Sequence, residues 1–222
     1  MRKGLTEVVF ILDRSGSMSG LEADTIGGFN SMIDKQKQEE GEAYISTVLF
    51  DDRAEVLYDR VEVSKIEPMT DKQYFVRGCT ALLDAVGGAI KHIGNIHKYA
   101  REEDRPEKTI FIITTDGMEN SSCHYNYNKV KRMVKRQQEQ YGWQFLFLGA
   151  NIDSVKVGKS FGIGANRAIN YNCDRKGTSL NYQVLSKTIS AFRRSKSTDD
   201  VDMIVDECCA PIRDDYEKRH ND

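Results

Sequence analysis

The stretch that decides the fold of this chain is Val8-Val9-Phe10-Ile11-Leu12-Asp13-Arg14-Ser15-Gly16-Ser17. Its first half is apolar and rich in β-branched side chains, which indicates a buried strand. Its second half places one carboxylate and two hydroxyls directly after that strand. In a sheet of parallel strands, ligands collect at the carboxyl ends of the strands. The stretch therefore predicts a polar site at one edge of a sheet.

Two segments further along the chain complete this site. Gly78-Cys79-Thr80 precedes a helical pattern, and the apolar, β-branched run at 109–115 ends in Asp116-Gly117. Because parallel strands end at the same edge of a sheet, we expect these groups to meet the residues after the first strand. Oxygen ligands alone suit a hard divalent cation and are unsuited to zinc or copper. The predicted metal residues are Asp13, Ser15, Ser17, Thr80 and Asp116.

This three-part pattern resembles the metal-ion-dependent adhesion site of von Willebrand factor type A domains. The resemblance covers roughly residues 5–195 and is closest to small, free-standing bacterial or phage members. It implies a binding module that uses Mg²⁺, with Mn²⁺ or Ca²⁺ as alternatives, to grip an Asp or Glu of a protein partner. It also implies that the three hydroxyls bind the ion directly, while Asp13 and Asp116 hold metal-bound waters or those hydroxyls.

Apolar runs alternate with helical patterns along the chain, which predicts an α/β fold with a doubly wound, mostly parallel sheet and helices on both faces. The run at 54–58 follows a tight turn and predicts one antiparallel edge strand. We expect one domain over residues 1–195 and a polar C-terminal tail over 196–222, weakly helical or mobile. The other expected strands are 6–12, 43–50, 109–115, 143–148 and 167–171, and the expected helices lie near 26–33, 80–97, 127–141, 153–161 and 179–194.

Composition limits the function classes. The chain has 222 residues, of which 39% are hydrophobic and 30% charged, so it can bury a core for one large domain. Its net charge of -2 argues against binding nucleic acid through bulk electrostatics. No signal peptide and no apolar run of about 20 residues is visible, so no membrane span is expected. Five cysteines without a Cys-x-x-Cys motif predict reduced thiols in the cytoplasm.

Two enzyme readings compete with a binding module. A phosphohydrolase of the haloacid dehalogenase type also has a strand that ends in Asp beside Mg²⁺, but its general acid two residues later is replaced here by Ser15. The run Gly16 to Gly20 matches a hydrolase elbow, for which His124 is the one plausible partner. We therefore predict binding without turnover. A scaffold whose polar residues only cap helices is the third reading.

Three further groups of charged or polar residues are expected to lie at the surface. Asp51 and Asp52 are expected in a solvated turn, and Glu119 and Asn120 are candidates for the rim of the metal site. The basic residues at 129–136 are expected to form a solvated helix face. The sequence makes no prediction of oligomeric state.

Overall fold

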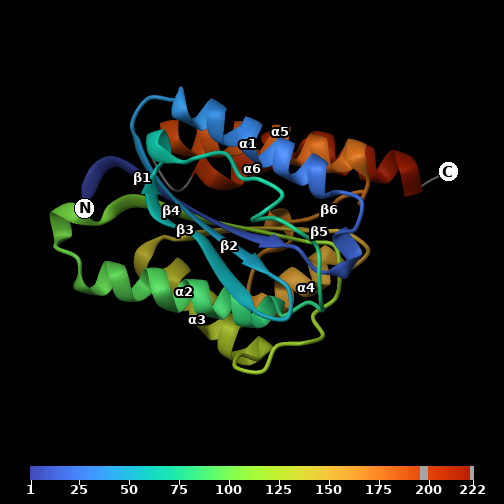
Figure 1. Ribbon diagram of the computed structural model, residues 1–222. Helices are drawn as coiled ribbons and strands as arrows, with labels where there is room; N and C mark the ends of the chain where they lie inside the picture. The colour runs from blue at the N-terminus through green and yellow to red at the C-terminus, as the bar shows by residue number, and fades with distance from the viewer. Residues whose placement is uncertain (196–199, 221–222) are drawn as a thin grey trace.

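The computed structural model describes residues 1–195 and 200–220, and it has a six-stranded sheet between two layers of helices (Figure 1). The strand order is β3-β2-β1-β4-β5-β6, and only β3 runs antiparallel to its neighbour. The predicted doubly wound α/β fold with one antiparallel edge strand is confirmed. The strands are β1 (Arg2–Asp13), β2 (Glu42–Phe50), β3 (Ala54–Glu62), β4 (Pro106–Thr115), β5 (Gln144–Gly149) and β6 (Ala168–Asn170).

Three helices cover each face of the sheet (Figure 1). One layer holds α1 (Glu22–Lys37), α5 (Arg175–Arg194) and α6 (Val201–His220), and the other holds α2 (Leu82–Tyr99), α3 (Tyr127–Tyr141) and α4 (Ser154–Phe161). Short 3-10 turns lie at Gly16–Met18, Val63–Lys65, Glu102–Asp104 and Ala165–Arg167. Within the described ranges, none of the helices has both the length and the apolar character needed to cross a membrane.

Strand β1 divides the core into two halves. Its side chains alternate between faces, so Val8, Phe10 and Leu12 pack beneath α1 and α5. Val9 and Ile11 pack on the side of α2 and α3. All five are at most 1% exposed, and a slip of one residue would exchange the two faces. Burial on both faces therefore fixes where β1 ends, and so fixes the position of the polar residues after it.

Buried cations hold two helix ends at the far edge of the sheet from those polar residues. Lys108 of β4 is 8% exposed, and its Nζ donates to the carbonyl oxygens of Phe192 (3.0 Å) and Arg193 (2.9 Å). Arg193 in turn donates to the carbonyl oxygens of Gln36 (2.7 Å), in the last turn of α1, and of Gly41 (2.9 Å), after that helix. The last carbonyl groups of a helix have no hydrogen-bond donor within the helix, and these two side chains provide the missing donors.

The C-terminal segment differs from its prediction. Residues 201–220 form a continuous helix, although a weakly helical or mobile tail was predicted for 196–222. Val201, Val205, Cys209 and Ile212 recur at helical spacing and are buried in the same core as α5. The charged residues between them hid this stripe in the sequence. Residues 196–199 and 221–222 lie outside the described part of the chain.

We expect Ile212→Ala to lower the free energy of unfolding by about 2–4 kcal/mol, because it removes a side chain that is 2% exposed. Met203→Ala on the same helix is the matched control, since Met203 is 59% exposed and its loss should cost less than about 0.5 kcal/mol. Urea unfolding of both variants measures the difference. Equal small effects would show that α6 does not pack as described.

Candidate metal centre

The two carboxylates of the predicted site lie at the ends of adjacent strands. Leu12 of β1 pairs with Thr114 of β4, so Asp13 and Asp116 leave the sheet at the same edge. Asp13 accepts hydrogen bonds from the backbone N–H of Ser15 (2.7 Å) and from Thr115 Oγ1 (2.5 Å). Both carboxylate residues are 1% exposed. The strand register thus holds two buried acids side by side.

The three hydroxyls complete the group. Ser17 Oγ donates to Asp116 Oδ1 over 2.5 Å and lies 3.1 Å from Ser15 Oγ. The hydroxyls of Ser17 and Thr80 both lie beside Gly117. A Cβ atom added to this glycine would be 3.3 Å from Ser17 Oγ and 3.6 Å from Thr80 Oγ1. The structure therefore brings together all five residues singled out in the sequence. Their binding of a metal ion stays a prediction.

Thr80 is placed by two side chains from other loops. Asn120 Oδ1 accepts the backbone N–H of Thr80 (2.9 Å), and the N–H of Asn120 donates to the Thr80 carbonyl (3.1 Å). Asp52 accepts the N–H of Cys79 beside Gly78, which has φ +67°. A Cβ at Gly78 would lie 2.6 Å from the Asp52 carboxylate, so this close approach needs glycine. Asp52 therefore shapes the site's loop and is not just part of a solvated turn.

A buried ion pair beneath the site escaped the sequence analysis. Arg14 has 0% exposure, and its Nε donates to Asp51 Oδ2 over 2.7 Å. Arg77 Nε donates to the same oxygen over 2.8 Å, and Glu55 binds the outer side of the Arg14 guanidinium. Both guanidiniums also lie about 5 Å from the ring of Phe75. The expectation of a solvated Asp51 is wrong, because this residue is 1% exposed.

The loop after Asp116 is tied to the start of α2. Glu119 accepts the backbone N–H of Leu83 over 2.8 Å, which satisfies a free amide of the first helical turn. Asp84 of α2 accepts the N–H groups of His124 (2.9 Å) and Tyr125 (2.8 Å) in return. Glu119 is therefore a capping residue for α2.

Two residues from the next strands also reach Asp116, and the sequence analysis named neither. The Cys173 thiol donates to Asp116 Oδ2 over 3.5 Å, and Asn151 Nδ2 donates to the Asp116 carbonyl over 3.3 Å. Asn151 follows β5 and Cys173 follows β6, so both stand at the same edge as the metal residues. The order of the strands would have indicated both residues, because β5 and β6 continue the sheet beyond β4 and end at the same edge. Burial raises the pKa of Cys173 to about 12, with the charge of Asp116 as a further cause.

Comparison of the sequence with protein-family models and with curated proteins finds no match. Solved structures do match. The PilB minor pilin from Streptococcus sanguinis superposes with a TM-score of 0.59 at 11% identity, over 83% of this chain and 61% of that one. A von Willebrand factor type A protein from Catenulispora acidiphila has a TM-score of 0.51 at 15% identity, over 82% of this chain and 41% of that one. The chain has the fold of a von Willebrand factor type A domain.

The type A fold is also found in proximal thread matrix protein 1 from the mussel byssus, solved with a zinc-occupied MIDAS motif. That structure has a TM-score of 0.54 at 16% identity, over 83% of this chain and 46% of that one. Identities this low establish the fold alone. The chain spans between 41% and 61% of the length of these three structures.

The donor set fits a hard cation. Burial raises the pKa of Asp13 to about 6, against hydrogen bonds from Ser15 and Thr115 that lower it, and burial also raises the pKa of Asp116. Neither acid forms an ion pair with a cationic side chain in the part of the chain that the structure describes. Two such buried acids are costly to ionise, and a bound cation would remove that cost. Among the described residues, no cluster of three or more His, Cys, Asp or Glu could hold a metal, so an ion here would need the hydroxyls.

We expect Asp51→Ala to lower the free energy of unfolding by about 3–5 kcal/mol, because it leaves the Arg14 guanidinium buried without its main partner. Glu55→Ala removes the other carboxylate on that guanidinium, but Glu55 is 58% exposed and should cost less than about 1 kcal/mol. Urea unfolding compares the two. A small loss in both variants would mean that the ion pair does not hold the site.

The raised pKa of Asp13 predicts a pH-dependent effect of Asp13→Asn in protein without metal. In the folded protein Asp13 keeps its proton until the pH reaches its raised pKa of about 6. In the unfolded chain it loses the proton near the ordinary pKa of 3.8. The free energy of unfolding contributed by this group therefore falls as pH rises through that window. The variant should be more stable than the wild type by up to roughly 3 kcal/mol above this window.

The advantage of Asp13→Asn should vanish below the window, where both forms are neutral. Thermal unfolding across this pH range, in the presence of a chelator, measures it. Asp71→Asn is the control, since the same substitution there changes an exposed side chain instead of a buried one. An advantage that stays constant with pH would show that Asp13 is ionised throughout.

Proposed function

We propose that this chain is a binding module, without turnover, that holds Mg²⁺ at the edge of its sheet and uses the ion to grip a carboxylate of a protein partner. The observation that carries the proposal is the meeting of three hydroxyls with two buried acids, Asp13 and Asp116, at one point. Mn²⁺ or Ca²⁺ could replace Mg²⁺. The type A fold and the zinc-occupied motif of the mussel protein support a metal at this place.

Each residue has a proposed role. Ser15, Ser17 and Thr80 would bind the ion through neutral oxygens, and the two carboxylates would orient those hydroxyls and metal-bound waters. Neutral ligands leave most of the ion's positive charge uncompensated. The charge then draws a carboxylate from outside, which would occupy the remaining coordination position. The ion supplies this electrostatic attraction, and the protein supplies its orientation.

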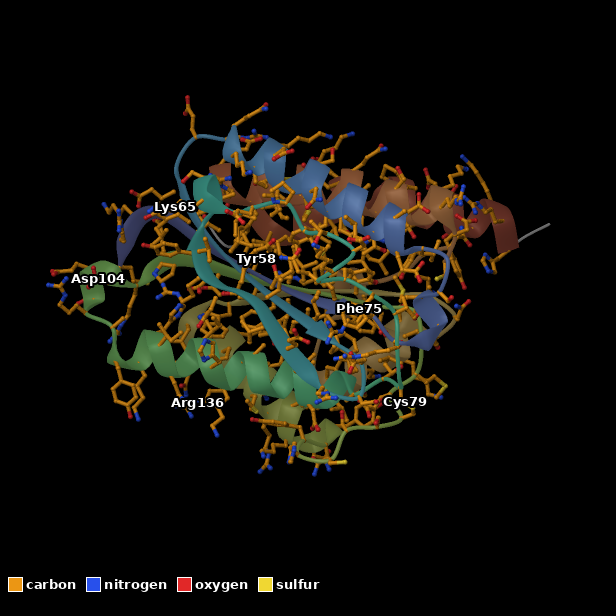
Figure 2. The ribbon with its side chains drawn as sticks, viewed as in Figure 1. Tyr58, Lys65, Phe75, Cys79, Asp104 and Arg136 are labelled. Carbon is orange, nitrogen blue, oxygen red and sulfur yellow. The ribbon has the colours of Figure 1, made fainter. Side chains whose placement is uncertain are left out.

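Side chains around the site would select the partner. Met118 beside Asp116 is 72% exposed, and Phe75 is 40% exposed on the loop that leads to Thr80. Figure 2 shows Phe75 and Cys79 toward one end of the sheet, opposite Asp104. Apolar groups beside a charged ion favour a peptide segment that carries both an acid and an apolar residue. A cytoplasmic location and a bacterial or phage origin are part of the proposal, on the sequence grounds given above.

The chemistry nearby supports binding over phosphoryl transfer. A phosphohydrolase needs a carboxylic acid free to protonate a leaving group, and Ser15 occupies the position where that acid is expected. Asp52 and Glu119, two further acids beside the site, accept backbone N–H groups of Cys79 and Leu83. Both carboxylates thus have structural roles already.

The test is a titration of metal-stripped protein with Mg²⁺, Mn²⁺ and Ca²⁺, followed by thermal unfolding. An ion at a hundred times its dissociation constant stabilises the folded state by about 2.7 kcal/mol, which raises the midpoint by roughly 5–10 °C in a chain of this size. Ser17→Ala should abolish the rise. Ser19→Ala, an exposed serine two residues later, should keep it.

The carboxylate requirement needs a second stage on the same samples. Peptides selected from a random display library on Mg²⁺-loaded protein should share an Asp or Glu, and their binding should be lost with chelator or on Asp→Asn or Glu→Gln exchange in the peptide. Peptides that bind equally well with chelator would contradict the proposed mechanism. If none of the three ions raises the unfolding midpoint, the proposed metal site itself is contradicted.

A further inference from the structure

Charge is divided unequally between the two helix layers of this protein. The layer of α2, α3 and α4 carries nine basic side chains and two acidic ones, Asp84 and Glu139. The nine basic side chains, all of them exposed, are Lys91, Lys98, Lys129, Lys131, Arg132, Lys135, Arg136, Lys156 and Lys159. The layer of α1, α5 and α6 carries both signs in nearly equal numbers. The net charge of -2 therefore conceals one strongly basic face.

The acids of the protein neutralise little of this face. In the part of the chain that the structure describes, Lys135 is the only one of the nine to pair with a carboxylate, that of Glu139 at 3.6 Å. Asp84, the other acid of this layer, accepts backbone N–H groups of His124 and Tyr125. A concentration of exposed charge of one sign on one face attracts a partner of the opposite sign. The expected partner of this face is an anion.

A groove of about 800 Å³ crosses this layer between α2 and α3. Four cations line it, Lys91, Lys98, Arg105 and Arg136, and none of them pairs with a carboxylate among the described residues. Figure 2 shows Arg136 on the outer side of this layer. The groove also holds Glu102 and Glu107, and the Glu107 carboxylate accepts the backbone N–H of Gly4 over 2.7 Å. Cations are thus in excess within the groove.

Aromatic rings share the groove with these cations. Trp143 lines it at 3% exposure, with the ring of His97 edge-on at 5.2 Å between centroids. Tyr141 also lines it and is 56% exposed, so its ring is free to stack on a flat group. Single-stranded nucleic acid is bound by this combination, because cations follow the phosphates while aromatic side chains stack on the bases.

Other anionic partners match the face less well. Between Asn128 and Glu139 every exposed position of α3 is charged or polar, so this helix offers a bilayer no apolar side chain to insert. A run of carboxylates in an acidic peptide would match the cations but would bring nothing planar to the exposed ring of Tyr141. Phosphates alternating with bases match both features of the groove.

We propose that the groove between α2 and α3 binds single-stranded nucleic acid, RNA or DNA, with its four cations on the phosphates and Tyr141 against a base. Pro106 and Trp143 line the groove, so it lies at the amino ends of β4 and β5. The predicted metal residues lie at the opposite edge of the sheet. Both sites can therefore be occupied together, and the chain would link a protein partner to a nucleic acid.

The test is fluorescence anisotropy of labelled oligouridylate and oligothymidylate, each of about 12 nucleotides, titrated with the full chain in the presence of a chelator. Binding should weaken with salt, with a slope of about -3 in a plot of the logarithm of the association constant against that of the salt concentration, because about four phosphates are neutralised. Tighter binding of one oligonucleotide assigns the ligand to RNA or to DNA.

Paired substitutions locate the binding surface. Lys98→Glu combined with Arg136→Glu should weaken binding at least about tenfold and reduce the salt slope by about half. Lys35→Glu combined with Lys187→Glu is the matched control, because it makes the same change in net charge at exposed positions of α1 and α5 and should change affinity by less than about twofold. Tyr141→Ala should weaken binding at least about fivefold, and Tyr141→Phe should keep it.

Several outcomes would overturn the inference. One is absence of oligonucleotide binding at low salt, and another is an equal loss in both charge-reversal pairs. If polyglutamate or phosphatidylserine vesicles displace the oligonucleotide as well as unlabelled oligonucleotide does at equal charge, the groove serves an acidic protein or a membrane instead. Ser17→Ala, which removes a predicted metal ligand, should leave oligonucleotide binding unchanged, so this inference and the proposed function fail separately.

Discussion

The buried pair of Arg14 and Asp51 is the interaction on which the architecture of the site depends. Arg14 follows β1 and Asp51 follows β2, so the pair joins two neighbouring strand ends where backbone pairing stops. Arg77 binds the same carboxylate, and this contact ties the loop that leads to Thr80 to the two strand ends. A buried charge cannot leave its partner without a large desolvation cost. Three separate segments are therefore fixed against one another beneath the predicted metal residues.

Much of the fold and site could be predicted because it follows from local pattern and topology. Apolar runs that end in Asp13 and in Asp116 imply two buried strands, and parallel strands bring their carboxyl ends together. The loop of Thr80 was placed by its position before a helix. The burial of β1 on both faces leaves its register no freedom, so the sequence pattern and the geometry agree closely here.

The parts that escaped prediction depend on contacts between residues far apart in sequence. Asp51 looks like an ordinary turn acid until Arg14 lies against it, and Cys173 shows no motif until β6 takes its place at the edge of the sheet. The packed helix α6 was not predicted for a different reason. Its buried stripe, which includes Val205 and Ile212, is narrow, and charged residues exposed to solvent occupy the other faces of the helix. Single-residue chemistry does not reveal such partners.

The ammonium of Lys108 has a consequence for how α5 can move. Its three hydrogen bonds to the carbonyls of Phe192, Arg193 and Ser195 act as an anchor at one end of that helix, and the other end begins beside Cys173. Translation of α5 along its axis would strip a buried cation of all three acceptors at once. Rotation about the anchored end would keep them. A movement of α5 that keeps these hydrogen bonds is therefore a rotation about this end of the helix, and its displacement is greatest at the other end, next to the predicted metal residues.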